Sequence, residues 1–299
     1  MTTRTIAGAA AVALLAACGG SSDDAAGSND AAPNTAVIDS TSSSTTSSST
    51  TSSTSTSSTT TAAPEPDPIE SLAGRWAHFD VVAYEDGVLK TLIISYGFND
   101  FTVSADGELI DQASFCFSEQ RTDQPISTSL SDAATQAIQP PPVAMGVEVM
   151  DGVVQLMRPP TPTPVGIRLD DPVTESLPTD RNDERIVDDD GDGNPGITVD
   201  IEVSEDLRGQ LYIARREIFS YTAEQVTPDR IEGVVVDDSE QLVVGASDPI
   251  FDQGDANWVQ LADPARNPII LERVDDTWDC ERLRAEREAL FPPTPDVDW

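Results

Sequence analysis

The sequence predicts a mainly β protein: an antiparallel barrel or sandwich with a short C-terminal helix, preceded by a disordered Ser/Thr-rich linker. From residue 76 onward, short runs of β-branched and aromatic residues follow one another, and several are separated by Asp-Gly turns. Helical spacing of apolar residues is clearest after residue 276. Every residue from 40 to 61 is Ser or Thr, a composition that cannot bury apolar surface.

The first half of the domain is predicted to be a meander of hairpins. The glycines that follow Asp in its turns permit the positive φ that tight hairpins need. A second turn type, Asn99-Asp100, is expected to interrupt the apolar run that ends at Phe98. The expected strands cover residues 76–84, 88–98, 101–104 and 108–117.

The second half is expected to continue the β pattern with two short helices. The Pro-rich run 159–164 indicates an extended polyproline segment on the surface. Two strands about Asp237–Glu240 are expected to form a hairpin, and Asp276-Thr277 to cap the last helix, which ends before Pro292. The other expected elements are a helix at 131–138 and strands at 143–157, 165–169, 197–203, 209–216, 230–236, 241–246 and 269–274.

The chain begins with the parts of a secretory signal: basic Arg4 and an apolar run, 6–15, that is too short to span a bilayer. Leu15-Ala16-Ala17-Cys18 resembles the lipobox of bacterial lipoproteins. The resemblance implies that Cys18 carries diacylglycerol, that cleavage precedes it, and that the new amino terminus is acylated. The predicted division is therefore a signal peptide (1–17), a lipidated tether (18–68) and one extracytoplasmic domain (69–299) on the cell membrane.

The charge balance constrains the partners. The net charge is −36, and from Ile69 onward 47 acidic residues stand against 16 basic ones. Such a field repels nucleic acid and anionic lipid head groups, so a lipid anchor is the expected membrane contact. Cations, cell-wall material or a small ligand are compatible with it. The alternative is a solvated acidic surface of the kind that salt-adapted secreted proteins carry.

The three cysteines divide between lipid and disulfide. If Cys18 is lipidated, Cys116 and Cys280 remain, and outside the cytoplasm such a pair forms a disulfide. The bond would tie the first half of the domain to its C-terminal helix.

One stretch has the spacing of a calcium loop. Asp188, Asp190 and Asp192, followed by a glycine, match its first, third and fifth positions, and Asn194 would offer a backbone carbonyl. The stretch resembles the first half of the calcium loops in dockerins and thrombospondin-type repeats. Its twelfth position is valine rather than glutamate, so it is not an EF-hand, and Asp183 or Asp200 is expected to complete the shell. The alternative is a turn whose acids lie in water.

Gly74-Arg75-Trp76 at the start of the meander resembles the G-x-W signature of lipocalins and other calycins. The resemblance implies an up-and-down barrel with the tryptophan at its base. No catalytic residue stands out: His78 is the sole histidine and is expected to be structural, and no nucleophile, phosphate or zinc motif is present. The expected function is an anchored binding or structural domain with a calcium-stabilised loop at 188–194. The alternative is a secreted hydrolase of glycosidase type that uses two carboxylates.

Overall fold

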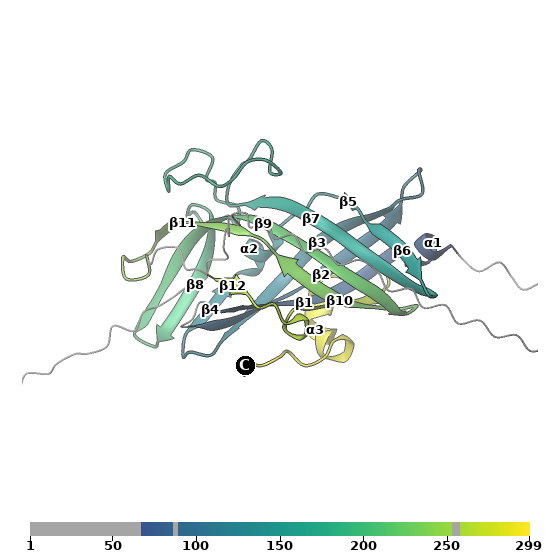
Figure 1. Ribbon diagram of the computed structural model, residues 1–299. Helices are drawn as coiled ribbons and strands as arrows, with labels where there is room; N and C mark the ends of the chain where they lie inside the picture. The colour runs from purple at the N-terminus through teal and green to yellow at the C-terminus, as the bar shows by residue number, and fades with distance from the viewer. Residues whose placement is uncertain (1–66, 86–88, 253–257) are drawn as a thin grey trace, which may run out of the picture. The chain divides into compact units, whose positions relative to one another are not determined.

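The computed structural model of the chain describes residues 67–85, 89–252 and 258–299. In these residues 13 strands form one antiparallel sheet that curls into a half-barrel (Figure 1), which confirms the predicted fold class. The strands are β1 (Gly74–Glu85), β2 (Lys90–Val103), β3 (Leu109–Thr122), β4 (Ser127–Leu130), β5 (Val143–Ala144), β6 (Gly146–Met150), β7 (Val153–Val165), β8 (Ile197–Ser204), β9 (Leu207–Thr227), β10 (Arg230–Asp237), β11 (Glu240–Ala246), β12 (Val259–Gln260) and β13 (Pro268–Val274). The described helices are α1 (Pro68–Leu72), α2 (Asp132–Gln136), α3 (Cys280–Leu290) and a 3₁₀ turn at Pro264–Arg266.

The long strand β9 organises the sheet. Along one edge it pairs first with β8 and then with β7, and along the other edge first with β11 and then with β10. From β10 the sheet continues through β13, β1 and β2 to β3. β5 pairs with β3, while β6, one residue further along the chain, pairs with β7. This connection brings β3 and β7 together, so that β1–β3 face β7 and β9 across an interior.

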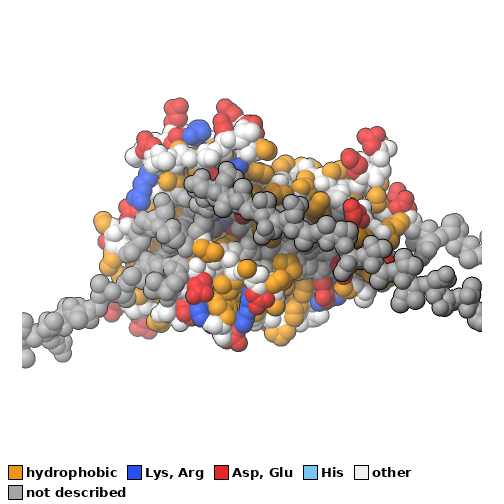
Figure 2. Space-filling view, viewed as in Figure 1, with side chains coloured by type: hydrophobic (Ala, Val, Ile, Leu, Met, Phe, Trp, Pro, Cys, Tyr) orange, Lys and Arg blue, Asp and Glu red, His pale blue; other side chains and the backbone are white. Residues whose placement is uncertain are grey.

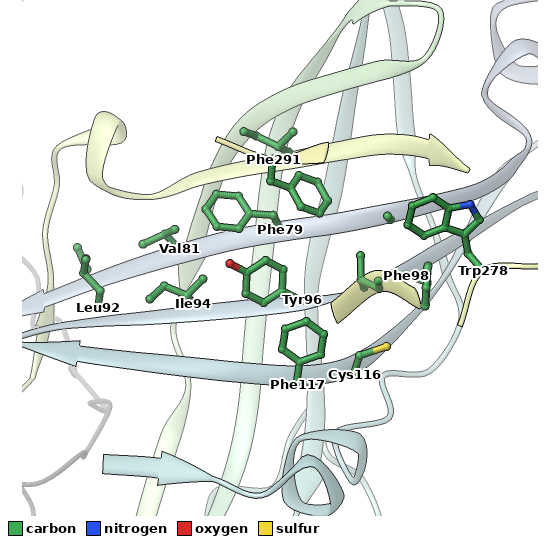
Figure 3. Close-up of a cluster of buried hydrophobic side chains, with 14 residues drawn as sticks. Phe79, Val81, Leu92, Ile94, Tyr96, Phe98, Cys116, Phe117, Trp278 and Phe291 are labelled. Atoms are coloured by element: carbon green, nitrogen blue, oxygen red, sulfur yellow. The ribbon is translucent and has the colours of Figure 1, made fainter. Parts of the chain in front are cut away.

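The two faces of β1 have different environments. Ala77, Phe79 and Val81 point to the face that α3 covers, where a fully apolar cluster forms (Figure 3). The alternate residues Trp76, His78 and Asp80 point into the curl of the sheet. Trp76 is fully buried there, and its indole N–H donates to the carbonyl of Leu72 at 2.9 Å. The interior is apolar at this end and becomes polar along the strand.

The predicted disulfide is present. Cys116 on β3 and Cys280 at the start of α3 are bonded, with 5.3 Å between their Cα atoms. The helix begins later than predicted because Asp279, not Asp276, is its N-cap: the Asp279 carboxylate accepts the N–H of Arg282 at 2.8 Å. One turn further on, Leu283 is fully buried against the sheet. The bond and this leucine hold α3 on the outer face of β1–β3.

The turn predicted at Asn99-Asp100 is wrong, because β2 runs through both residues. Asn99 lies opposite Trp76 on β1 and Ala113 on β3, so it is in the middle of the sheet. Its side chain is buried and finds hydrogen-bond partners in the interior. Tertiary contacts therefore override the turn propensity of this dipeptide.

The Pro-rich run is part of a strand instead of a surface segment. Pro162 and Pro164 lie opposite Ile218 and Arg216 on β9. β6 pairs only with residues 153–157, so among the described strands none covers the outer edge of β7 beyond Met157. Proline is tolerated in a strand where one edge needs no N–H donor. The intervening Thr161 and Thr163 are buried.

The hairpin predicted about residues 237–240 is also wrong, because β11 pairs with β9 and not with β10. Ser239 at the turn explains the change of partner. Its hydroxyl accepts the N–H of Ile218 on β9 at 2.9 Å and contacts the Glu217 carboxylate at 2.9 Å. These bonds hold the turn against β9, so the chain continues along that strand.

Cys18 and the Ser/Thr run lie outside the described residues. Within the described ranges no helix has both the length and the apolarity to cross a membrane.

Candidate functional site

The predicted calcium loop lies in the long connection between β7 and β8. Figure 2 shows acidic side chains standing on this connection, above the end of the sheet. Asp188, Asp190 and Asp192 come together there, with one carboxylate oxygen of each within 4.8 Å of the others. Gly191 and Gly193 have φ of 75° and 92°, so the loop turns sharply at residues without a Cβ.

The first aspartate shapes the loop. The Asp188 carboxylate accepts the backbone N–H groups of Gly191, Asp192 and Gly193 at 2.7, 3.2 and 2.9 Å. The N–H of Asp189 donates to the carbonyl of Gly196 at 3.1 Å and closes the base of the loop. The first carboxylate is thus oriented by backbone hydrogen bonds within the loop itself.

The other two aspartates are tied to the start of β8. Asp190 Oδ2 accepts the N–H of Thr198 at 2.9 Å, whereas Asp190 Oδ1 is buried without a hydrogen-bond partner. Burial raises the pKa of Asp190. The Asp192 carboxylate accepts hydrogen bonds from the Thr198 hydroxyl at 2.6 Å and from the backbone and side-chain N–H groups of Asn194. Although burial opposes it, these bonds lower the pKa of Asp192. Three clustered carboxylates could hold a metal ion, and oxygen donors of this kind suit hard cations.

The two aspartates expected to complete the shell are bonded elsewhere. Asp183 accepts from the Arg185 guanidinium at 2.9 and 3.1 Å, and these bonds lower the pKa of Asp183 to about 2. Asp200 accepts the side-chain amide of Gln210 at 3.0 Å. Asp189 turns away from the cluster to Arg168, with which it forms a two-point ion pair at 2.6 and 2.9 Å. The loop therefore presents three carboxylates and leaves further positions to carbonyl groups or water.

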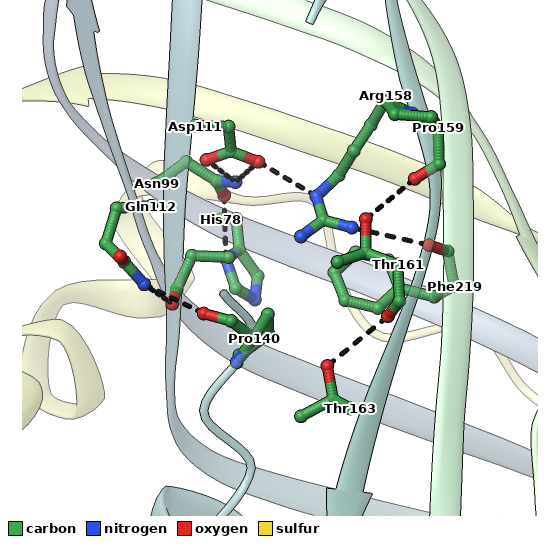
Figure 4. A network of polar contacts seen from close by, with 11 residues as sticks. His78, Asn99, Asp111, Gln112, Pro140, Arg158, Pro159, Thr161, Thr163 and Phe219 are labelled. Atoms are coloured by element: carbon green, nitrogen blue, oxygen red, sulfur yellow. Dashed lines mark hydrogen bonds and ion pairs between the residues drawn. The ribbon is translucent and has the colours of Figure 1, made fainter. Parts of the chain in front are cut away.

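A second polar site lies in the interior of the sheet and was not identified from the sequence. Arg158 and Asp111 are both fully buried and form an ion pair, with 2.9 Å between Arg158 Nε and Asp111 Oδ2 (Figure 4). Asn99 donates its amide to both oxygens of Asp111 at 2.8 and 3.0 Å. The Asn99 carbonyl oxygen then faces His78 Nδ1 at 2.9 Å. Figure 4 shows this series of contacts running across the interior.

The series of contacts from Arg158 to His78 determines which ring nitrogen of His78 carries the proton. Because the Asn99 amide N–H groups are used by Asp111, its oxygen must accept, so His78 Nδ1 carries the proton. Burial lowers the pKa of His78 to about 4. Nε2 therefore has a free lone pair, and within the described part of the chain it has no hydrogen-bond partner. It lies 3.6 Å from Asp80 Oδ2.

Asp80 lines a cavity of about 90 Å³ in the curl of the sheet. Burial, with the nearby charges of Asp237 and Glu217, raises the pKa of Asp80 to about 8. Glu217 is paired with Arg215, whose Nε is 2.6 Å from Glu217 Oε1. The polar lining consists of Asp80, Tyr84, Ser95, Ser118, Gln120, Thr135, Arg215, Glu217 and Asp237. The apolar lining consists of Val82, Ile93, Phe115, Leu130, Ile138, Phe219 and Val235.

Part of this site left a signal in the sequence. Asp80 and His78 alternate with apolar residues in a strand that is otherwise buried on both faces. A charged residue in such a strand needs a partner across the interior. The partners on β9 and β10 cannot be assigned without the fold.

Comparison of the chain with protein-family models, with curated proteins and with solved structures gives no match. The function is therefore inferred below from the loop and the cavity.

Proposed function

We propose that this chain is a lipid-anchored extracytoplasmic protein whose domain binds calcium at loop 188–194. The loop supports the metal, and the sequence Leu15-Ala16-Ala17-Cys18 supports the anchor. The Cys116–Cys280 disulfide supports an oxidising compartment.

The observation that carries the calcium proposal is the convergence of three carboxylates about an oxygen with no donor. Asp188, Asp190 and Asp192 each bring one oxygen to within 4.8 Å of the others, and like charges so close repel one another unless a cation lies between them. Asp190 Oδ1 is buried without a protein donor, which is costly for a carboxylate oxygen. A bound cation would satisfy it.

The donor set favours calcium over other common ions. The cluster offers oxygen only, whereas zinc prefers nitrogen and sulfur. Magnesium demands a near-ideal octahedron and keeps several waters, while calcium accepts six to eight oxygens in irregular geometry. An exposed loop with three carboxylates, a carbonyl at Asn194 and water therefore suits calcium. Sites with few protein ligands work at about 10⁻⁴–10⁻³ M in extracellular modules.

The calcium proposal is tested by isothermal titration on the full chain carrying Cys18→Ser. With the loop unaltered, this chain should bind calcium saturably with a dissociation constant in the range given above. Calcium should also raise its Tm. Asp190→Asn should weaken binding at least tenfold. Asp206→Asn, which makes the same charge change in the exposed turn between β8 and β9, is the matched control and should bind as before. Absence of heat with millimolar calcium, or equal binding by Asp190→Asn and the control, would overturn the proposal.

The anchor proposal has its own test. Cells expressing the unaltered chain should hold it in the membrane fraction, and it should incorporate labelled fatty acid. Cys18→Ser should move the chain to the soluble extracytoplasmic fraction without label, because no other lipid attachment is proposed. A Ser21→Ala variant, altered three residues later, should behave as the unaltered chain. Membrane retention of the Cys18→Ser protein would show that the lipobox interpretation is wrong.

A further inference from the structure

The cavity beside Asp80 contains more buried negative charge than its positive groups balance. Three carboxyl groups line it, from Asp80 on β1, Glu217 on β9 and Asp237 on β10, against the single guanidinium of Arg215. Arg215 is committed to Glu217, with contacts of 2.6 and 3.1 Å. Burying an uncompensated carboxylate is costly, so Asp80 holds a proton near neutral pH and Asp237 is left without an ion-pair contact of its own. Together the two groups offer a place for a cation that would displace the Asp80 proton.

Among the described residues Asp237 receives hydrogen bonds from neutral donors alone, and Arg215 acts on its charge without a hydrogen bond to it. Tyr84 donates its hydroxyl to Asp237, and the N–H of Ser239 donates to it at 2.9 Å. The Ser239 hydroxyl also contacts Asp237 and, at 2.9 Å, Glu217. One hydroxyl proton cannot serve both carboxylates at once. None of these contacts neutralises the charge.

Among the described residues Asp80 has no cationic partner either. It is about nine-tenths buried, at 9% exposure, and its polar neighbours are the Ser95 hydroxyl and His78 Nε2. That nitrogen is 3.6 Å away, is itself buried without a partner, and carries no proton. Its ring is fixed in this orientation by Asn99 and, behind it, by Asp111. The interior thus directs a lone pair at Asp80, whose carboxyl group lines the cavity, and the described residues supply no cation to it.

The rest of the lining defines the shape of a ligand. The other walls of the cavity are apolar, with Phe115, Phe219, Val82, Ile93 and Val235 among them. A bare metal ion would leave these walls in contact with water, whereas a short hydrocarbon chain would cover them. The volume of about 90 Å³ lies well below the ~300–1,000 Å³ of pockets for drug-sized ligands. A sugar polymer, the substrate of a glycosidase, is therefore disfavoured.

We propose that this cavity binds a small primary ammonium ion on a short alkyl chain, with the ammonium group between Asp80 and Asp237 and the chain against Phe115 and Phe219. This names a ligand for the binding role of the anchored domain, but it does not depend on the calcium loop. Three donors on the ammonium match the carboxylate oxygens that lack a cation. So small a ligand is expected to bind at about 0.1–10 mM, because few heavy atoms limit the affinity.

The proposal is tested with n-propylammonium chloride on the full chain carrying Cys18→Ser, at constant ionic strength. Titration calorimetry should show saturable binding, and binding at pH 7 should release a proton, since an ammonium ion favours the ionised form of Asp80. The proton is measured by repeating the titration in buffers of different ionisation enthalpy. n-Propanol, which has the same shape and no charge, should not bind. Chelation of calcium should leave the result unchanged, which separates this proposal from the loop.

Two variants and a comparison with potassium ions complete the test. Asp80→Asn should abolish proton release, and Asp237→Asn should weaken binding at least tenfold. Asp206→Asn, with the same charge change on the surface, should bind as before. The variants are first shown to be folded by near-ultraviolet circular dichroism, and each alone suffices if the other fails to fold. Equal effects of potassium and propylammonium, binding unchanged in the folded variants, or no binding by the unaltered cavity would each overturn the proposal.

Discussion

The buried ion pair between Arg158 and Asp111 gives a sharp test of how the interior is held together. Both side chains are fully buried, and 2.9 Å separates Arg158 Nε from Asp111 Oδ2. Two unit charges about 4 Å apart attract by about 4 kcal/mol at an effective dielectric constant of 20. Removing one partner also leaves the other charge buried, and measured costs are about 3–5 kcal/mol. Arg158→Met should therefore lower the free energy of unfolding by about 4 kcal/mol.

The assay is urea denaturation of the full chain carrying Cys18→Ser, with the disulfide intact. Arg208→Met is the control, because Arg208 forms an exposed pair with Glu202 that should contribute under about 1 kcal/mol. Burial already raises the pKa of Asp111, against the opposing effect of Arg158. Without Arg158, Asp111 can accept a proton, so the cost of Arg158→Met should be smaller at pH 5 than at pH 7. Equal costs for the two arginine variants would refute this reasoning.

Two further predictions concern pH and the disulfide. The pKa of Asp80 is raised to about 8, so between pH 6.5 and 8 the native state holds a proton that the unfolded state has lost. The pKa of His78 is lowered to about 4, so native His78 is neutral across this interval, and only the residual protonation of the unfolded state just above pH 6.5 opposes the slope. Stability should fall by up to about 2 kcal/mol over this interval in urea titrations, and Asp80→Asn should remove the slope; an unchanged slope would contradict the assignment. Replacing Cys116 and Cys280 by alanine opens a loop with a sequence separation of 164 and should cost about 5 kcal/mol in the same assay, whereas a loss under about 1 kcal/mol would show that the bond constrains little.

Local features of the fold could be predicted where neighbours in sequence decide them. The apolar run of β1, the cap of α2 at Ser131 and the glycine-rich turn at residues 191–193 all follow from nearby residues. The gathering of Asp188, Asp190 and Asp192 is local in the same sense, because backbone N–H groups of the loop orient the first carboxylate. The disulfide could be predicted from its compartment and from the number of cysteines.

The failures arise where distant strands decide the structure. Asn99 has a high turn propensity but lies in a strand, because Asp111 and His78 offer its side chain hydrogen-bond partners. The prolines of β7 are tolerated because β6 begins only at Gly146, opposite Met157, so that among the described strands none covers this edge beyond that point. Asp80 was not identified as a site residue because the charged residues that share its cavity, Arg215, Glu217 and Asp237, lie more than 130 positions later in the sequence, on β9 and β10. No periodicity within β1 could reveal them.

The arrangement of the interior favours a functional origin for its charges. Apolar residues of similar volume would stabilise a core at least as well as a buried ion pair, so a pair such as Arg158–Asp111 is weak evidence for stability alone. The pair does fix the orientation of the Asn99 amide, and the amide determines which nitrogen of His78 carries the proton. That choice leaves the lone pair of Nε2 facing Asp80 at the cavity. The lone pair faces the proton that Asp80 holds near neutral pH, and the proposed cation would displace that proton.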